Sequence, residues 1–417
     1  MNQIVAPSPT SSREAVRRAI RSIAAGSSRI ESIDLVRGAV MILMALDHVR
    51  EYFHFDALLY SPTDLQRTTP AIFATRLITH LCAPTFIFLA GVSAHFIARR
   101  RTVRGASVFL LTRGAWLVIL QLTIIRFAWN FDPAFHYNSS NIISTIGFSM
   151  MALAGLIHLK PRTILIVGLA MSMGHNALDG VSFPAGSAAD VLWSFLHVRK
   201  FYAMAHGRSF LFLYPLVPWV GVMGLGYSLG RIYDRDWSVE KRRSTLLQIG
   251  AACLFAFVVL RWVNVYGDPS PWAHQRDPGT TFMSFLNVEK YPPSLLYLCL
   301  TLGVSLLLLG ALEGRNLRAF RPVLTVGRVA LFYYVVHLYA IHAAALVAVT
   351  RAGFPWQTMV FPGPQTQASP LLKGIFGFGL AGTYTVWAAI VLLLYPLCAR
   401  WNSLKSRYQG KWWVSYV

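Results

Sequence analysis

The residues best suited to chemistry stand together in one apolar stretch, residues 32–54. Asp47, His48 and Glu51 lie within five positions of one another, in a segment otherwise fit for a bilayer interior. Ionisable groups are costly in hydrocarbon, so such a segment marks a candidate functional site. A carboxylate beside a histidine fixes the imidazole tautomer for acid–base work. We therefore predict a histidine that acts as general base or transient acyl carrier, either His48 or, three residues after Glu51, His54.

A second group lies at the other end of the same stretch. Arg37 precedes His48 by eleven residues, so on a helix the two side chains fall within ~20° of one face and ~16 Å apart along the axis. Asp34 lies one turn before Arg37, and the small or flexible side chains in residues 41–45 would leave room for an extended ligand. Arginine is suited to phosphate and histidine to proton transfer. The spacing thus predicts a phosphate-bearing ligand held along this helix.

Each of these residues also has a purely structural explanation. Arg37 alone is better explained as a charge that reaches toward the membrane surface, and Asp47 with Arg50 as an interfacial ion pair. The full Asp-x2-Arg-x10-His set favours a functional site over those separate explanations.

The elements that must position these residues are membrane-spanning helices. The 417 residues are 55% hydrophobic and 13% charged, against ~25% charged in an average soluble domain. Apolar runs near the ~20 residues that cross a bilayer recur throughout the chain. We predict an all-α polytopic membrane protein, a single bundle of about ten transmembrane helices. They are placed at residues 33–53, 71–98, 107–128, 141–158, 162–177, 210–230, 244–264, 294–312, 323–350 and 372–398.

The net charge of +21 follows the same organisation. Most lysines and arginines lie in short segments between apolar runs, as expected of cytoplasmic loops, so both termini are predicted to be cytoplasmic. Topology and anionic lipid account for this charge without a nucleic-acid partner. We expect a basic cytoplasmic tail over residues 1–30, a transmembrane domain over 31–400, and a basic, aromatic cytoplasmic tail over 401–417.

Further polar side chains are predicted at the two ends of the bundle. Two arginines are expected near the Arg37 end as phosphate contacts, Arg113 and Arg328. Four side chains are expected near the His48 end, facing a second substrate: Arg76, His80, Arg126 and His337. No metal is predicted, because outside the first helix no histidine–aspartate pair has helical ligand spacing in a helix-forming, water-facing stretch.

Several motifs resemble those of known families. Arg37-x10-His48 matches the R-x10-H motif of the acyltransferase-3 membrane family. The run 29–44 more closely resembles the heparan-α-glucosaminide N-acetyltransferase family and its bacterial relatives. So do residues 81–93, 214–224, 290–294 and 327–337, so the resemblance covers about residues 29–400.

The resemblance implies transmembrane acetyl transfer. Acetyl-CoA would bind from the cytoplasm, and an amino or hydroxyl group, typically on a sugar, would accept the acetyl group at the opposite face of a bacterial inner membrane. In the family's lysosomal enzyme an asparagine stands at the position of His48, and its catalytic histidine corresponds to His54 here. The R-x10-H motif favours His48 instead. Direct transfer and an acetyl-histidine intermediate both remain open, as does a homodimer.

Two functions of other classes are alternatives. A secondary transporter of a small polar or anionic solute would also carry polar residues on several helices, although paired broken helices in two halves are not evident. The other alternative is a catalytically inactive relative that acts as a membrane scaffold. The presence of Arg37, His48 and Glu51 argues against it.

Overall fold

The computed structural model describes residues 30–363, 370–408 and 411–416. Helices dominate these residues, which confirms the predicted all-α class of membrane protein. The predicted tail over residues 1–30 lies outside the described residues except for its last position. The α-helices are α2 (Glu31–Phe53), α3 (Pro70–Thr79), α4 (Cys82–Ala98), α5 (Val103–Leu120), α6 (Arg126–Asn130), α7 (Ile142–Leu156), α8 (Pro161–Gly174), α9 (Ala188–Leu196), α10 (Leu216–Leu229), α11 (Val239–Val263), α12 (Pro278–Leu286), α13 (Leu295–Leu312), α14 (Arg321–Arg328), α15 (Ala330–Arg351) and α16 (Leu380–Arg407).

Several helices begin where local chemistry specifies a start. The Ser294 hydroxyl accepts the Tyr297 amide at the start of α13, and the Ser238 hydroxyl accepts the Lys241 amide at the start of α11. These side chains satisfy backbone donors that a helix N-terminus leaves unpaired. Pro161 occupies the first turn of α8, where its missing N–H costs nothing.

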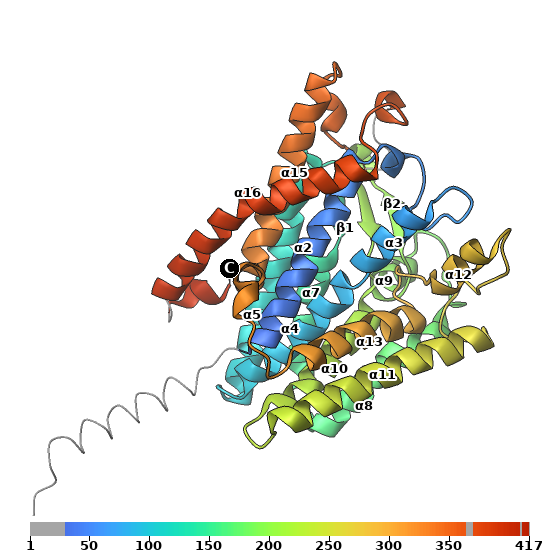
Figure 1. Ribbon diagram of the computed structural model, residues 1–417. Coiled ribbons are helices and arrows are strands. Elements are labelled where there is room, and N and C mark those ends of the chain that lie inside the picture. The colour runs from blue at the N-terminus through green and yellow to red at the C-terminus, as the bar shows by residue number, and fades with distance from the viewer. Residues whose placement is uncertain (1–29, 364–369, 409–410, 417) are drawn as a thin grey trace, which may run out of the picture.

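Helix α2 lies in the middle of the bundle (Figure 1), where it contacts α3, α4, α13, α14, α15 and α16. Its closest approach is to α14, where the backbones of Gly38 and Gly327 meet. A Cβ on Gly38 would lie 2.0 Å from the Val323 carbonyl oxygen, so only glycine fits this crossing. The remaining strong pairings are α11 with α13, α5 with α7, and α10 with both α4 and α8. The helix that carries the candidate chemistry is thus enclosed on most sides.

Six helical stretches among the described residues are long and apolar enough to cross a membrane. They are Pro70–Ala98, Val103–Asn130, Val239–Val263, Leu295–Leu312, Ala330–Arg351 and Leu380–Arg407. Large apolar side chains project outward from them, with Trp262 of α11 73% exposed and Leu392 of α16 73% exposed. Such side chains suit a hydrocarbon environment rather than water.

The other predicted spans correspond to helices that are shorter or more charged. Helix α2 carries several charged residues, and α7, α8 and α10 have 15, 14 and 14 residues. The predicted stretch 71–98 is interrupted between Thr79 and Cys82, just before Pro84, a residue type that disrupts the preceding helical turn. The stretch 323–350 is likewise divided, because α14 ends and α15 begins on either side of Val329.

Two boundaries of the predicted spans are wrong. Residues 210–212 belong to a strand rather than to the start of a span, because they pair with two other segments in a small sheet. The strands are β1 (Tyr137–Ser140), β2 (Lys200–Ala203) and β3 (Ser209–Phe212), in the order β1-β3-β2, with β1 parallel and β2 antiparallel to β3. At the other boundary, α16 begins at Leu380, eight residues later than predicted, and continues to Arg407.

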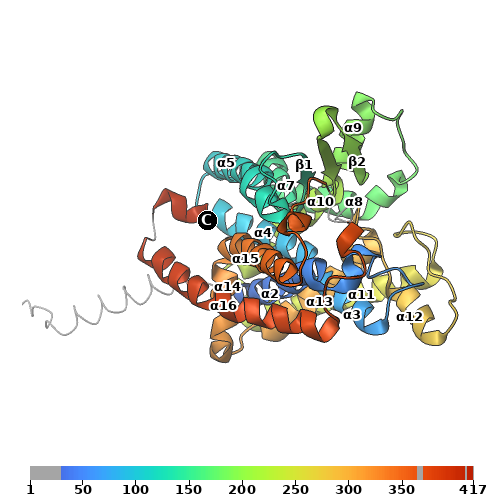
Figure 2. The ribbon, with the colours of Figure 1, turned by 90° about the horizontal axis from the view of Figure 1, so that it is seen from above.

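The sheet lies at one side of the bundle, together with α9 (Figure 2). Its first strand follows α6 and its third strand leads into α10, so the sheet connects to helices on both sides of it in the sequence. Three of its residues, Tyr137, Ser139 and Leu211, line the cavity described next.

Candidate active site

A cavity of about 710 Å³ opens at the C-terminal end of α2. Residues from α2, α3, α6, β1, β3, α15 and the loop before α13 line it. Five lining residues are on α2 itself: Met44, Asp47, His48, Arg50 and Glu51. Three of the four predicted second-substrate residues, Arg76, His80 and Arg126, also line this cavity.

The fourth, His337, lies directly behind His48. The Nδ1 atom of His48 is 2.7 Å from the Nε2 atom of His337, and the Nδ1 atom of His337 is 2.8 Å from the Tyr333 carbonyl oxygen. A carbonyl only accepts, so Nδ1 of His337 donates, and in the neutral ring its Nε2 accepts the proton of His48 Nδ1. This chain leaves Nε2 of His48 unprotonated, with no hydrogen bond among the described residues. The geometry therefore presents a basic nitrogen to the cavity.

Aromatic rings hold this histidine pair in place. The His48 ring meets the edge of Trp129 with centroids 4.7 Å apart, and it lies nearly coplanar with the hydrogen-bonded His337 ring, with centroids 5.0 Å apart. The Tyr333 ring stacks on His337 at 5.2 Å. Because His48 is 8% exposed and His337 is fully buried, both rings have little freedom to turn.

The carboxylate next to His48 is committed to arginines. One oxygen of Asp47 is 2.5 Å from Nη1 of Arg76, and the other is 3.2 Å from Nη2 of Arg50. Among the described residues Asp47 makes no hydrogen bond to His48, and the partner that fixes the His48 tautomer is His337. Glu51 lies 3.9 Å from Arg50 and keeps 30% of its side chain exposed, so its carboxylate faces the cavity.

Arg126 serves mainly to hold the loop that follows α6. Its guanidinium donates to the carbonyl oxygens of Tyr137 and Asp132 and to the Asp132 carboxylate, the last at 2.7 Å. The Phe135 ring lies beneath it at 4.1 Å. His80 is held differently, since its own carbonyl accepts the Tyr297 hydroxyl at 2.8 Å while its buried Nδ1 has no partner among the described residues.

The loop before α13 covers the cavity with residues that were not predicted as site residues. Lys290 and Tyr291 line it, with the Lys290 ammonium 5.1 Å from the Tyr291 ring and the Tyr214 hydroxyl 3.5 Å from that of Tyr291. Burial alone would raise the pKa of the Tyr291 phenol, but Lys290 and Arg76 bring it below its usual range. A lysine and a phenol of this kind can orient a polar substrate.

His54 is not among the residues that line the cavity. It ends α2, where its Nδ1 atom accepts the Asp56 amide at 3.2 Å and its ring stacks on Phe55. Its backbone is paired with Phe378, just before α16. Burial lowers the pKa of His54, and among the described residues its ring makes no hydrogen bond to a residue that lines the cavity. Of the two histidines left open by the motifs, His48 is the one that faces the cavity.

The four predicted phosphate contacts gather at the opposite end of α2. Arg37 donates to Asp34 at 3.1 Å and to the Ser93 hydroxyl at 3.2 Å. Arg328 of α14 approaches the other oxygen of Asp34 at 3.5 Å, and Arg113 of α5 lies within electrostatic range of Arg37. Arg37 and Arg328 therefore flank one carboxylate at this end, and Arg113 adds a third positive charge near Arg37.

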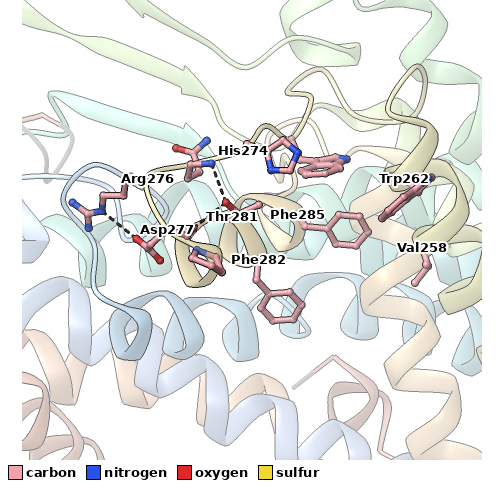
Figure 3. A pocket seen from close by; sticks show the side chains of 11 residues that line it. Val258, Trp262, His274, Arg276, Asp277, Thr281, Phe282 and Phe285 are labelled. Atoms are coloured by element: carbon pink, nitrogen blue, oxygen red, sulfur yellow. Dashed lines mark hydrogen bonds and ion pairs between the residues drawn. The ribbon is translucent and has the colours of Figure 1, made fainter.

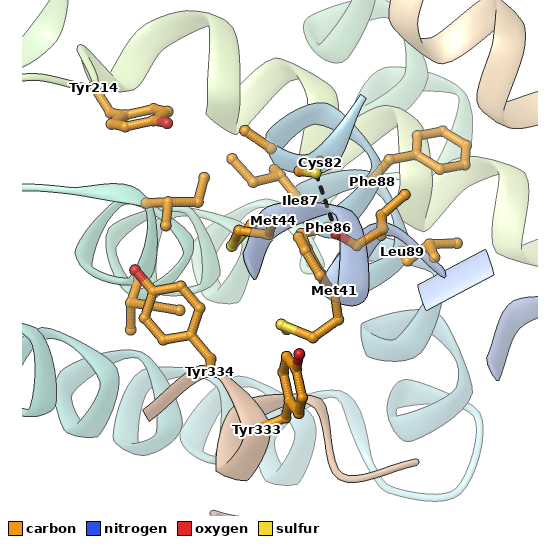
Figure 4. Packing of buried hydrophobic residues seen from close by; sticks show 14 of the residues in the cluster. Met41, Met44, Cys82, Phe86, Ile87, Phe88, Leu89, Tyr214, Tyr333 and Tyr334 are labelled. Carbon is orange, nitrogen blue, oxygen red and sulfur yellow. Dashed lines mark hydrogen bonds between the residues drawn. The ribbon is translucent and has the colours of Figure 1, made fainter. Parts of the chain in front are cut away.

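The space expected between the two ends of α2 is filled. Met41 and Ala45 are buried in the main core, and Figure 4 shows Met41 beside Phe86 and Tyr333. Met44 alone of the three expected channel residues lines the cavity. The prediction of an open path along this face is therefore wrong for this conformation, because neighbouring helices supply bulky side chains that the sequence of α2 does not reveal.

Comparison with known families identifies the chain. The model for heparan-alpha-glucosaminide N-acetyltransferase, catalytic, matches residues 29–261, more than half of the sequence. The chain belongs to this family. No curated protein sequence matches it in a search of such proteins.

The family model matches this acetyltransferase-family chain from the start of α2 almost to the end of α11. It includes Arg37, Asp47 and His48 but neither His337 nor the loop with Lys290. Most of the lining residues that were not predicted lie within the matched part, among them Tyr60, Trp129 and Tyr214, whereas Lys290 and Tyr291 lie outside it. Tyr214, Lys290 and Tyr291 fall in the segments 214–224 and 290–294, whose resemblance to the family was the sequence signal for them.

A second pocket of about 720 Å³ lies between α11 and α12 (Figure 3). Its lining is largely aromatic and includes Trp262, Phe282 and Phe285, with Phe282 63% exposed. It includes none of the residues around His48. Exposed aromatic side chains of this kind suit the edge of a bilayer, so this pocket is not the candidate active site.

Proposed function

We propose that this family member transfers an acetyl group from acetyl-CoA across a membrane to an amino or hydroxyl group of a sugar-type acceptor. The observation that carries the proposal is the hydrogen-bond chain from Tyr333 through His337 to His48, which leaves a basic nitrogen facing the cavity. The family match supports acetyl transfer over transport, and nothing in the described residues favours the transporter alternative.

Acetyl-CoA, the acyl donor, binds in this proposal at the Arg37 end of α2. Arg37, Arg113 and Arg328 supply positive charge there, and Asp34 aligns two of them. Guanidinium groups bind phosphate through paired, charge-assisted hydrogen bonds, so three of them suit the phosphates of CoA. The thioester must then reach His48, ~16 Å along the axis, which requires Met41 and its neighbours to move aside.

At the other end, His48 acts as general base. As the acceptor nitrogen or oxygen attacks the thioester carbonyl carbon, Nε2 of His48 takes the proton of the attacking N–H or O–H. The carbon–sulfur bond breaks, CoA leaves as thiolate, and the imidazolium returns the proton to that thiolate. The His337 contact stabilises the transient imidazolium because Nδ1–H of His48 stays bonded throughout. An acetyl group on Nε2 would be the intermediate in a two-step version of the same reaction.

The charge around the cavity indicates the class of acceptor. Its lining includes more basic than acidic side chains: Arg50, Arg76, Arg126, Arg199, Lys290 and Lys373 against Asp47, Glu51 and Glu289. Even with Arg126 neutralised by Asp132, five basic side chains face three carboxylates, so the surplus is positive. We therefore propose a sugar that carries a phosphate, sulfate or carboxylate group.

The proposed topology places the Arg37 end in the cytoplasm and the cavity on the opposite face of a bacterial inner membrane. The six apolar helices then span the bilayer together with α2, α7, α8 and α10, which makes ten, and both termini are cytoplasmic. The arginine-rich connections 99–104 and 231–243 fit this orientation.

The reaction is tested with purified protein in detergent, acetyl-CoA and a panel of neutral and anionic amino sugars, with free CoA as the readout. Wild-type protein should release CoA faster with an acceptor than without one, and anionic sugars should act at lower concentration. Equal CoA release with and without every acceptor, at the level of His48→Ala, would refute the proposal. Accumulation of an unmodified sugar in sealed vesicles would instead support transport.

A further inference from the structure

Three metal-ligating side chains converge outside the cavity. His175 begins the short helix η3 (His175–Leu178) after α8, Asp179 follows it, and His197 ends α9. One ligand atom from each lies within 4.8 Å of the other two. The Nε2 atom of His197 is 3.0 Å from an Asp179 oxygen, and the two imidazole rings are 5.6 Å apart. None of the three lines the cavity around His48.

The hydrogen bonds within this cluster leave His175 unexplained. His175 is 2% exposed, and neither of its ring nitrogens makes a hydrogen bond within the described residues. The buried Nδ1 atom of His197 is also without a partner there. A buried polar group without a partner costs free energy, so these nitrogens require something that the protein chain does not itself supply.

We propose that His175, Asp179 and His197 bind a divalent transition-metal ion, with Zn²⁺ the best fit. Two imidazoles and one carboxylate are ligands that Zn²⁺ prefers, and a water completes the tetrahedron. Ligand atoms ~2.05 Å from a tetrahedral ion lie ~3.3 Å apart, close to the 3.0 Å between His197 and Asp179. The Asp179 side chain is 28% exposed, which leaves a path for the ion and its water.

Neighbouring groups already orient the ligands. The Asn176 amide donates to the second oxygen of Asp179 at 2.9 Å, and its carbonyl oxygen accepts the Leu295 amide at 2.9 Å. The Pro293 carbonyl lies near the His175 ring, outside good hydrogen-bond geometry in this structure. A backbone carbonyl beside one ring nitrogen is the usual outer partner of a histidine that binds metal through the other.

The position of the site indicates a structural role. It joins the end of α8, the end of α9 and the start of α13, three segments far apart in the sequence. The same short loop that brings Pro293 to His175 carries Lys290 and Tyr291 over the cavity. The ion would therefore fix the loop that covers the acceptor side, without taking part in acetyl transfer.

This proposal departs from the expectation that no metal is bound. His175 and Asp179 are four residues apart, a ligand spacing that the sequence analysis failed to recognise. The reason is that both fell near the end of a predicted span, 162–177, which the structure ends earlier, at Gly174.

The test uses full-length protein purified without a histidine tag, stripped with a chelator, and titrated with Zn²⁺ alone and separately with Co²⁺. We expect one Zn²⁺ per chain and, for bound Co²⁺, the absorption of a tetrahedral site. His175→Ala and Asp179→Asn should each weaken binding at least ~10–100-fold, the loss that follows from removing even an outer partner. His158→Ala, at an exposed histidine after α7, should bind as wild type does.

Zn²⁺ should also raise the thermal midpoint of stripped wild-type and His158→Ala protein but not that of Asp179→Asn. This variant keeps a side-chain oxygen and nearly the same size, so it tests metal binding without leaving an empty space in the packing. Absence of stoichiometric binding to wild type overturns the proposal, and so does equal binding by wild type and both site variants. These measurements require no substrate, so they stand whether or not the acetyl-transfer proposal holds. If stripped protein loses CoA release and Zn²⁺ restores it, the ion holds the loop with Lys290 and Tyr291 in place over the cavity.

Discussion

Replacement of His337 by alanine tests how the structure sets the protonation of His48. His337 does not line the cavity, so it contacts neither proposed substrate, and it acts only through its 2.7 Å hydrogen bond to His48. Without it, the buried Nδ1–H of His48 loses its acceptor, and the tautomer with the proton on Nδ1 is no longer favoured. The ring then spends much of its time with Nε2 protonated and unable to act as a base.

The size of the effect follows from that single bond. A buried donor left without its partner costs about 1–3 kcal/mol. Because 1.36 kcal/mol corresponds to tenfold, the productive form of His48 should become ~5–150-fold rarer. We expect kcat for acceptor-dependent CoA release to fall by that factor, with KM for acetyl-CoA nearly unchanged. His48→Ala should lose more, ~10²–10⁴-fold, because the base itself is gone.

Two further variants separate positioning from general damage. In His337→Gln the amide oxygen can accept from His48, so part of the lost kcat should return. The double variant His48→Ala/His337→Ala should be no slower than His48→Ala, because the second change acts only through the first residue. If His337→Ala keeps full kcat, or if the two losses multiply in the double variant, the hydrogen-bond chain does not set the reactivity of His48.

The remaining predictions concern binding and stability. Arg37→Ala should weaken CoA binding by ~10–150-fold in calorimetry, since a hydrogen bond to a charged group contributes about 1.5–3 kcal/mol, and unchanged affinity would leave Arg37 only a topological charge. Gly38→Ala should destabilise by about 1–3 kcal/mol or more in denaturant unfolding, because its Cβ would meet the Val323 carbonyl, whereas Gly155→Ala, with open space around it, should be neutral or stabilising. A similar loss in both glycine variants would contradict the close helix crossing. Arg76→Met should cost about 3 kcal/mol, the lower end for breaking a buried ion pair, because Asp47 keeps Arg50, and an unchanged unfolding midpoint would show that the pair contributes nothing.

Helix periodicity predicted which residues share an end of α2 but not what lies beside them. Asp34, Arg37 and Arg328 could be grouped because all three fall at the same ends of their predicted helices. The pairing of His48 with His337, 289 residues apart, depends on α15 lying against α2. A single sequence indicates that both histidines are buried, and it does not indicate that they meet.

The same limit explains the two main errors. The face of α2 between its ends looked open because Met41 and Ala45 are small or flexible, yet Phe86 and Tyr333 from other helices fill that space. The strand at 210–212 was read as apolar span because pairing with β1 and β2 is invisible in a local window.

The most direct test of the central claim compares His48→Ala with His54→Ala in the CoA-release assay, using an anionic amino sugar as acceptor. His48 faces the cavity with a free ring nitrogen, whereas His54 ends the helix outside it. We predict that His48→Ala falls to the acceptor-free background and that His54→Ala stays within about threefold of wild type, the effect of a change below ~0.7 kcal/mol. Background activity in His54→Ala with full activity in His48→Ala would contradict the account.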